Sequence, residues 1–242
     1  MTHASKVSFS IVSHGHGRFV ESLLDDFRSL RLPSYEILIT LNIEEDEGFI
    51  ARHEELPITV IRNSTSQGFG ENHNKALSLA SGEFFAVVNP DVRLKNFDIG
   101  PILESLANGS VGLCAPAVYS SSGELEDSAR KFPTVALLLG RKLRRRNGPD
   151  YSLSGGPVTV DWVAGMFMVF RREVFAMVGG FDERYFMYFE DVDICRRVWR
   201  AGWSVMLNPL ARITHDAQRA SRRDLRHVAW HVRSAFRFLV LR

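Results

Sequence analysis

The sequence predicts an α/β protein with a mostly parallel central sheet flanked by helices. Short apolar runs alternate with amphipathic stretches over the first ninety residues. Several of these runs end in polar or glycine-containing turns, and in sheets of this kind ligands lie beyond the carboxyl ends of the strands. The chain has 242 residues, no internal repeat and no clear linker, which favours one continuous domain.

Four strands are expected in the first part of the chain, because four runs are short, apolar and bounded by turn residues. These runs are residues 7–12, 36–41, 58–61 and 84–88. Apolar residues at helical spacing predict a helix between the first two, which Pro33 closes. A polar glycine loop after the third run opens a second helix that ends near Gly82.

The alternation is weaker in the second part of the chain, where residues 120–157 are rich in polar and turn-forming residues. The expected strands there are 111–119, 158–162, 166–170, 203–207 and 212–215. The expected helices are 99–107, 172–178, one that begins at residue 190, and a last one over 221–242.

Composition and charge exclude several classes of protein. The net charge of only +2 lacks the strongly basic signature of a nucleic-acid-binding protein. Cys114 and Cys195 have no metal-ligand spacing, so we expect reduced thiols in a reducing compartment. No signal peptide precedes the first strand, and no apolar run approaches the ~20 residues of a membrane helix. We therefore expect a cytoplasmic protein, with peripheral contact at the inner face of the cell membrane at most.

Three acids, Glu190, Asp191 and Asp193, follow an aromatic-rich loop and begin an amphipathic helix. Free N–H groups and the helix dipole favour negative charge there, so the carboxylates are expected to stay ionised. An ionised carboxylate in a cleft can accept a proton. The alternative is that these acids only cap the helix.

Asp91 and His215 are candidate metal ligands. Asn89-Pro90-Asp91 follows a buried strand, and a carboxylate at a strand end can bind a hard cation such as Mg²⁺ or Mn²⁺. His215 follows a short extended run, and a neutral imidazole can ligate a divalent ion. The alternatives are a plain turn and an ordinary histidine, and His14 and His16 carry the same ambiguity.

The loop around Gly68 and Gly70 lets the backbone approach a ligand closely. Asn63, Asn72 and Asn74 add amide groups for hydrogen bonds. The loop matches neither the dinucleotide-binding nor the Walker pattern, and its alternative is a flexible connection.

Aromatic and basic segments are the remaining candidates. Trp162 and Gly165 could line a sugar pocket, or the tryptophan could serve core packing. The basic run 141–146 could attract phosphate or an anionic membrane surface, or be a solvated charge run. The basic amphipathic helix 221–242 could lie on a membrane or pack on its own domain.

Five segments together resemble the family 2 glycosyltransferases of the GT-A type, nearest to the bacterial rhamnosyltransferase-like members. They are SIVSHG, NSTSQGFGENHNKAL, FFAVVNPDV, the run from WVAGMFMVF to DVDICRRVWRAGW, and RITHD. The resemblance covers most of the chain, and 165–203 is its most specific part. It implies a Rossmann-like GT-A domain over 1–220, with a nucleotide-sugar half, 1–92, and an acceptor and catalytic half, 93–220. The basic helix 221–242 follows that domain.

The resemblance implies a metal-dependent, inverting transfer from a nucleotide diphosphate sugar to a hydroxyl of a bacterial surface glycan, such as O-antigen, capsule or cell-wall polysaccharide. The expected donor is dTDP-rhamnose, with UDP-sugars next, and the acceptor is often lipid-linked. Asp191 would be the general base and Glu190 would orient the acceptor. Asp91 and His215 would hold Mg²⁺ or Mn²⁺, and Trp162 and Gly165 would face the acceptor. The expected donor-binding residues are Ser13, His14, Asn42, Asn63, Gly68, Gly70, Asn72, Asn74 and Asn89.

The sequence departs from the family pattern at two strand ends. Leu41-Asn42 stands where members usually have an aspartate that contacts the base, and Ser13-His14-Gly15 replaces Thr-Tyr-Asn. These changes leave open a catalytically inactive binding domain of the same fold. A sugar-1-phosphate nucleotidyltransferase would need a basic glycine-rich loop after the first strand, where only Arg18 is basic.

Overall fold

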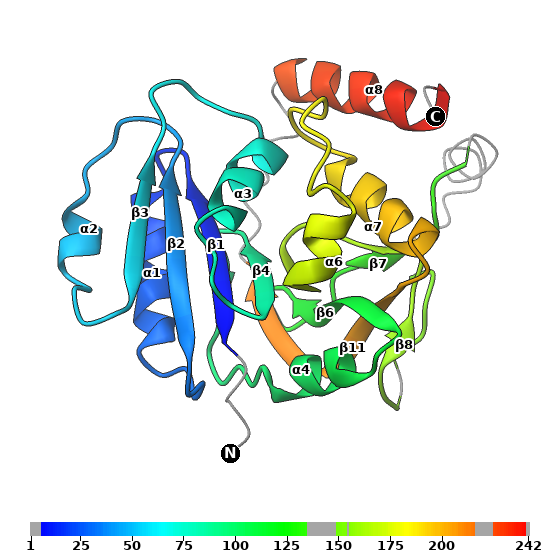
Figure 1. The fold of residues 1–242 in the computed structure, drawn as a ribbon, viewed down its shortest axis with the longest axis horizontal. Helices are drawn as coiled ribbons and strands as arrows, with labels where there is room; N and C mark the ends of the chain where they lie inside the picture. The colour runs from blue at the N-terminus through cyan, green and yellow to red at the C-terminus, as the bar shows by residue number, and fades with distance from the viewer. Residues whose placement is uncertain (1–5, 135–148, 154, 216–224, 241–242) are drawn as a thin grey trace.

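The computed structural model describes residues 6–134, 149–153, 155–215 and 225–240. The basic run 141–146 and the expected start of the last helix at residue 221 lie outside these ranges. Within them, the α/β prediction is confirmed: a twisted sheet is covered by helices on both faces (Figure 1).

The N-terminal half contains the four strands and two helices that the alternation predicts, and adds a short helix, α2, that it does not predict. Three of its strand pairs, β1 with β2, β1 with β4 and β2 with β3, are parallel. The elements are β1 (Val7–Ser13), α1 (Gly17–Phe27), β2 (Tyr35–Leu41), α2 (Gly48–Ala51), β3 (Ile58–Arg62), α3 (Phe69–Leu77) and β4 (Phe84–Val88).

The C-terminal half adds strands on the other side of β4 and makes the sheet mixed. The strand order is β3-β2-β1-β4-β10-β6-β11-β5, and β8 pairs with β11. The elements are β5 (Val92–Arg93), α4 (Gly100–Ala107), β6 (Val111–Tyr119), β7 (Ala129–Arg130), β8 (Val158–Thr159), β9 (Trp162–Val163), β10 (Phe167–Arg171), α6 (Arg172–Met177), α7 (Glu190–Arg200), β11 (Ser204–His215) and α8 (Leu225–Val240).

Two expectations about strand bounds are wrong. The runs 203–207 and 212–215 are one strand, β11, whose pairing with β6 shifts register between Asn208 and Arg212. The Asn208 side chain bonds the backbone at Pro101 and Leu210 in this irregular stretch, so the chain continues instead of turning. The run 158–162 is split into β8, which pairs with β11, and β9, which pairs with β7.

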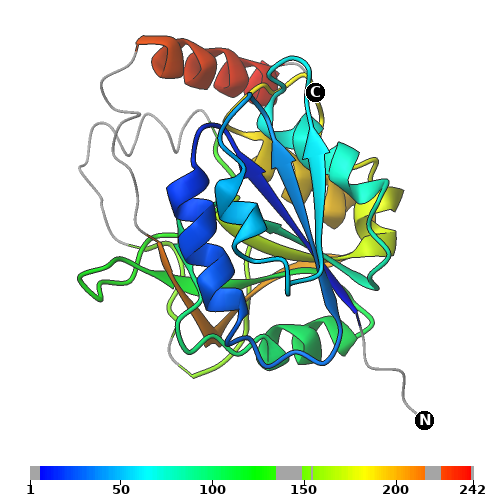
Figure 2. The same ribbon diagram turned by 90° about the vertical axis from the view of Figure 1, so that its left-hand side faces the viewer.

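Both faces of the sheet are buried by helices. On one face, α1 and α4 pack through fully buried residues such as Leu24 and Ile102. On the other face, α3, α6 and α7 pack through residues such as Phe175 and Ile194 (Figure 2). Apolar side chains on both sides of β4 explain why this strand reads as a continuous hydrophobic run.

Strand β10 fixes the geometry of the site because it runs antiparallel to both β4 and β6. The residues that enter β10 therefore lie beside the residues that leave β4. The Asn89 N–H donates to the Met166 carbonyl across this junction, at 2.9 Å.

Helix α8 lies across the same end of the molecule (Figure 1). Phe238 packs against Phe189, and the Ser234 hydroxyl donates to the Met187 carbonyl at 3.0 Å. One side of α8 therefore packs on its own domain. Within the described ranges, no helix has the length and apolar character needed to span a bilayer.

Candidate active site

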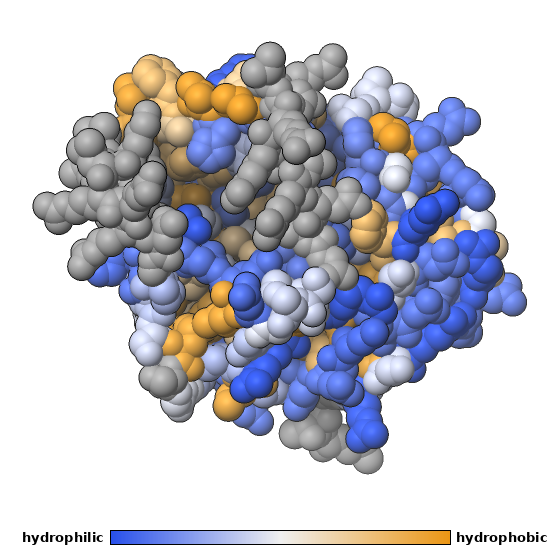
Figure 3. Space-filling view, turned by 180° about the vertical axis from the view of Figure 1, so that it is seen from behind, coloured by the Kyte–Doolittle hydropathy of each residue, from blue (hydrophilic) through white to orange (hydrophobic). Residues whose placement is uncertain are grey.

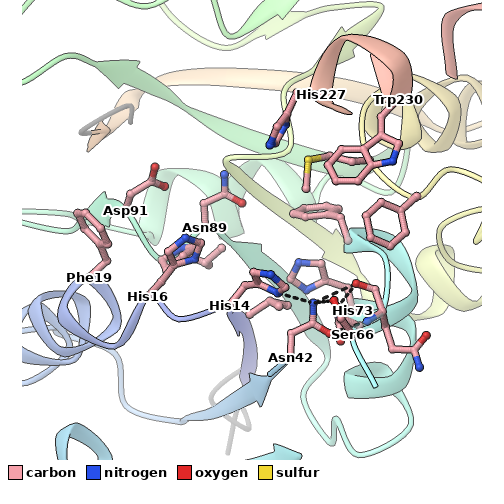
Figure 4. Close-up of a pocket in the computed structure, with 18 residues that line it drawn as sticks. His14, His16, Phe19, Asn42, Ser66, His73, Asn89, Asp91, His227 and Trp230 are labelled. Atoms are coloured by element: carbon pink, nitrogen blue, oxygen red, sulfur yellow. Dashed lines mark hydrogen bonds between the residues drawn. The ribbon is translucent and has the colours of Figure 1, made fainter. Parts of the chain in front are cut away.

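A cavity of about 520 Å³ lies beyond the carboxyl ends of β1, β2 and β4 (Figure 4). Five of the predicted site residues line it: His14, Asn42, Asn72, Asn89 and Asp91. The wall on the far side is built by the loop before α7 and by α8. These two segments contribute Phe186, Met187, His227 and Trp230.

Asn42 is 5% exposed and its amide is fully used by the protein. Its Nδ2 bonds His14 Nδ1 at 3.2 Å and donates to the Gln67 carbonyl at 3.0 Å. Its Oδ1 accepts from Gln67 N at 2.8 Å and Asn63 Nδ2 at 3.0 Å. Asn42 therefore ties the end of β2 to the glycine loop and orients His14 at the cavity wall.

The other asparagines of the glycine loop also make structural bonds. Asn72 donates to the Gly68 carbonyl at 2.9 Å and closes the start of α3. Asn74 joins α3 to the turn before α7, since its side chain bonds both the N–H and the carbonyl of Phe181 at 2.8 Å. Asn63 and Asn74 line a second, polar recess.

The glycines allow close backbone packing. A Cβ on Gly68 would lie 3.0 Å from the Phe186 carbonyl oxygen, and the Phe69 N–H donates to that same oxygen at 3.0 Å. A Cβ on Gly70 would lie 2.5 Å from Phe181 Cβ. Ser13 is buried, and its hydroxyl accepts from His16 N at 3.1 Å. Ser13, Gly68 and Gly70 do not line the cavity themselves but support the backbone of the residues next to it.

Asp91 and His215 are in contact, as the sequence predicts for two ligands of one ion. His215 Nε2 lies 3.3 Å from Asp91 Oδ2, and its Nδ1 lies 3.1 Å from Glu126 Oε2. Burial lowers the pKa of His215, but the hydrogen bonds with Asp91 and Glu126 outweigh it, so the pKa is raised. The imidazole is thus held between two carboxylates.

The second oxygen of Asp91 fits a cation. Asp91 Oδ1 is buried and has no hydrogen-bond partner, which is costly for a polar atom without a ligand. A carboxylate oxygen suits a hard cation such as Mg²⁺ or Mn²⁺, and a neutral imidazole can add a nitrogen ligand to a divalent ion. Within the described part of the chain, no cluster of three or more His, Cys, Asp or Glu ligands occurs.

Asp191 lies at the same rim of the sheet as Asp91. Its Oδ2 accepts from the Gly165 N–H at 3.2 Å, and Met166, the next residue, is bonded to Asn89 at 2.9 Å. The segment before β10 therefore connects the start of α7 to the end of β4. Two carboxyl groups that are far apart in the sequence are thus connected through one short segment, and of the two Asp91 lines the cavity whereas Asp191 does not.

The pKa values of Asp191 and Glu190 are shifted upward, against the lowering that a helix start alone would give. Burial raises the pKa of Asp191 and opposes the hydrogen bonds from the N–H groups of Val192 and Gly165. Burial and the charge of Asp191 raise the pKa of Glu190 well above its usual range. Desolvation outweighs the favourable helix start here. A raised pKa suits a carboxylate that exchanges a proton.

The loop before α7 has a strained backbone. Tyr188 and Phe189 have φ values of 70° and 68°, in the left-handed region that residues other than glycine rarely adopt. The Tyr188 hydroxyl bonds His227 Nδ1 at 2.7 Å, and Phe189 packs against Phe238. Contacts with α8 therefore hold the strained turn that sets the direction of Glu190 and Asp191.

Asp193, the third acid, has a structural environment. It is 5% exposed and pairs with Arg196 at 3.0 Å and Arg197 at 2.7 Å. Arg197 also donates to the carbonyls of Val178 and Gly180. Asp193 thus anchors α7 to the Gly179-Gly180 turn.

Trp162 and Gly165 lie outside the cavity wall. The Trp162 indole donates to the Lys131 carbonyl at 3.0 Å, and its ring packs at the edge of the core. Gly165 contributes its N–H to Asp191. Their expected acceptor roles stay predictions.

Sequence reasoning missed three residues of this region. Glu126 lies in a polar loop with no distinguishing pattern, and only the fold brings it to His215. His227 and Trp230 lie in α8 and line the cavity. Two aromatic rings within a basic amphipathic helix are the sequence feature that could have indicated them.

Comparisons with known proteins agree on one family. Residues 11–178 match the family model described as glycosyl transferase family 2. Rhamnosyltransferase WbbL of Escherichia coli K12 is 29% identical over 246 residues, which cover 95% of this chain and 90% of the relative. The N-acetylglucosaminyl-diphospho-decaprenol L-rhamnosyltransferase of Mycobacterium tuberculosis is 31% identical over 191 residues, or 73% of this chain and 61% of the relative.

Solved structures share the fold at low identity. GalNAc-T7 with UDP, GalNAc and Mn²⁺ has a TM-score of 0.65 at 16% identity and covers 90% of this chain. The mannosyltransferase PcManGT of Pyrobaculum calidifontis, with GDP-Man and Mn²⁺, has a TM-score of 0.67 at 18% identity and covers 98%. The chain spans 45% and 65% of those two proteins. The match to the family model over more than half of the chain, together with these relatives, shows that the chain belongs to glycosyl transferase family 2 and is a glycosyltransferase.

Proposed function

We propose that this protein is a metal-dependent, inverting rhamnosyltransferase that moves L-rhamnose from dTDP-rhamnose to a hydroxyl of a bacterial surface glycan. Two relatives that are named rhamnosyltransferases support the sugar. The name of the mycobacterial relative supports a lipid-linked acceptor. The observation that supports the proposal is the short connection between the two acids: Asp191 accepts from the Gly165 N–H, and the carbonyl of the next residue, Met166, accepts from the Asn89 N–H, two residues before Asp91.

Asp91 Oδ1 and His215 Nε2 would hold the divalent ion. When bound, the ion neutralises charge that develops on the diphosphate leaving group. His215 must give up its proton to act as a ligand, and Glu126 then accepts a hydrogen bond from the other ring nitrogen and fixes the ring. The partnerless Asp91 Oδ1 supports this assignment.

Asp191 would be the general base. It takes the proton of the acceptor hydroxyl while that oxygen attacks the anomeric carbon and the bond from that carbon to the diphosphate oxygen breaks. Attack from the side opposite the leaving group inverts the anomeric centre and needs no enzyme nucleophile. Glu190, whose pKa is raised well above its usual range, can donate a hydrogen bond that orients the acceptor. Gly165 would hold Asp191 in place.

The donor would occupy the cavity from His14 to Asn89. Because the Asn42 amide is fully bonded within the protein, base recognition falls to groups beside it. A UDP-sugar is the second candidate donor, because thymine and uracil offer the same N3–H and carbonyl groups and the Asn42 amide is already bonded within the protein. We retain 1–92 as the donor half, 93–220 as the acceptor half, and the final helix as a separate element.

Turnover of dTDP-rhamnose with Mn²⁺ by wild type and by Asp191→Asn tests the proposal. The variant should lose at least ~100-fold in turnover, the lower range for a general base, and should still bind dTDP-rhamnose. Asp98→Asn is the matched control, since Asp98 caps the exposed start of α4. Near-normal turnover of Asp191→Asn contradicts the base assignment. If the wild-type protein turns over a UDP-sugar but not dTDP-rhamnose, the UDP-sugar is the donor.

We also propose peripheral membrane contact through α8, at the cytoplasmic face. Apolar surface gathers at the end of the molecule where α8 lies (Figure 3). Four exposed apolar side chains recur in α8 at i, i+4 spacing, and the helix carries three arginines and no acid. They are Val228, Val232, Phe236 and Val240, 52–63% exposed. Phe236→Glu should release the protein from phosphatidylglycerol vesicles. Leu210→Glu, which changes an apolar residue of similar exposure outside α8, should not.

A further inference from the structure

Helix α8 supplies one wall of the cavity as well as the exposed stripe on its outer side. Its His227 and Trp230 line the cavity, on the side away from His14 and Asn42 (Figure 4). The family-model match covers residues 11–178, and the residues of this wall follow it in the chain.

Two aromatic rings form the open part of that wall. The Phe186 and Trp230 ring centroids are 4.9 Å apart with the planes tilted by 42°. Phe186 is 40% exposed although it borders a pocket. A large apolar side chain left open beside polar groups is typical of a ligand site.

Bonds from three directions hold the pair in place. The Phe186 carbonyl accepts from Phe69 N at 3.0 Å, which fixes the loop to the start of α3. The Tyr188 hydroxyl bonds His227 Nδ1 at 2.7 Å, and the His227 ring contacts the Trp230 ring at 5.0 Å between centroids. The rings are therefore preorganised on both the loop and the helix.

We propose that Phe186 and Trp230 form a stacking platform for a sugar ring at the active site, and that Trp230 determines specificity for that ring. The C–H groups on one face of a pyranose are apolar and suit an aromatic face, while its hydroxyls suit the polar groups that share the cavity. A nucleobase is the less suitable occupant, because the platform belongs to the loop that leads directly into Glu190 and Asp191. This inference rests on the proposed function and names a subsite of it.

The test uses the full chain with Mn²⁺ and compares wild type, Trp230→Ala and Trp230→Phe. Calorimetry gives the dissociation constants of dTDP and of dTDP-rhamnose, and their ratio isolates the contribution of the donor sugar. A transfer assay with an octyl N-acetylglucosaminide gives the KM of an acceptor sugar. Trp199→Ala is the matched control, because Trp199 bonds the backbone of Val160 and Asp161 and does not line the cavity.

Trp230→Ala should weaken sugar recognition about tenfold, the usual size for a truncated aromatic anchor, and leave the dissociation constant of dTDP unchanged. A loss in the dTDP-rhamnose to dTDP ratio assigns the platform to the donor sugar, and a loss in acceptor KM assigns it to the acceptor. Trp230→Phe should retain most of the recognition, which separates stacking from a folding defect.

Three results would overturn the platform. The first is a Trp230→Ala variant with unchanged sugar affinity and unchanged acceptor KM. The second is a loss of affinity for dTDP as large as the loss for dTDP-rhamnose, and the third is the same loss in Trp199→Ala. Wild-type protein that binds neither dTDP nor dTDP-rhamnose would instead overturn the proposed donor, and the platform with it. A functional wild type with an unaffected Trp230→Ala variant rejects the platform alone.

Discussion

Asp191 and Asp193 lie two residues apart at the start of α7, and we expect their replacement by asparagine to have opposite effects. Asp193→Asn should destabilise the fold and leave the chemistry of the folded enzyme intact. Asp191→Asn should leave the fold intact and remove the chemistry. The contrast follows from what each carboxylate touches.

The size of the Asp193 effect follows from its two ion pairs. The carboxylate is 5% exposed, and its oxygens pair with Arg196 at 3.0 Å and Arg197 at 2.7 Å. Removing one partner of a buried ion pair costs about 3–5 kcal/mol, because the other charge is left buried. Asparagine still accepts one hydrogen bond, so we expect a loss near ~3 kcal/mol in the free energy of unfolding.

Asp191→Asn should change the free energy of unfolding little, because two effects on it oppose each other. Because its pKa is raised in the folded state, the folded protein binds the proton more tightly than the unfolded chain. At pH values above the unfolded pKa, the ionised carboxylate therefore disfavours folding. A neutral asparagine removes that penalty but loses one of the two N–H bonds from Val192 and Gly165. We expect stability within ~1 kcal/mol of wild type.

Urea denaturation followed by circular dichroism, with turnover measured on the same preparations, checks both statements. An Asp193→Asn variant with the wild-type midpoint would refute the assignment of Asp193 as a structural anchor. An Asp191→Asn variant that lost several kcal/mol would refute the view that burial of its charge opposes folding.

Three further predictions concern the metal, the pH profile and the packing of the glycine loop. Glu126→Gln should weaken Mn²⁺ binding 10- to 100-fold by calorimetry, because the partner that orients His215 is weakened; unchanged affinity would remove Glu126 from the site. Since a base acts only when deprotonated, kcat/KM should rise with pH through the raised pKa of Asp191, so the acid limb lies above the ordinary value of 3.8; a limb at or below that value contradicts the burial. Gly70→Ala should lower the free energy of unfolding by about 1–3 kcal/mol, because the added methyl group crowds Phe181. The ~1 kcal/mol gain in helix propensity offsets this only partly. Equal or higher stability of the variant in urea would contradict the close packing.

The sequence predicts the N-terminal half well, because hydrophobic periodicity and the positions of turn residues agree there. Each strand from β1 to β4 is an apolar run that stops at a polar turn, and parallel strands place those turns at one rim. The position of Asp91 follows directly. Local pattern does not reveal direction, so the antiparallel course of β10 and the continuity of β11 through Pro209 required the structure.

The chemical state of the site was less predictable than its members. A helix start suggests ionised acids, but burial of Glu190 and Asp191 depends on the loop and on α8, which local sequence does not place. Asn42 reads as a free amide at a strand end, and only the fold shows its bonds to His14 and Gln67. The raised pKa values of the two acids and the bonded state of the Asn42 amide both depend on contacts between segments that are far apart in the sequence.

The antiparallel course of β10 gives the enzyme a modular layout. The four parallel strands leave the rim at Asn89, whereas the polypeptide of the second half returns to that rim at Met166. The residues just ahead of β10 therefore build part of the rim without belonging to the parallel strands. A change in that segment can alter how Gly165 meets Asp191 while the pairing of β1 to β4 stays the same.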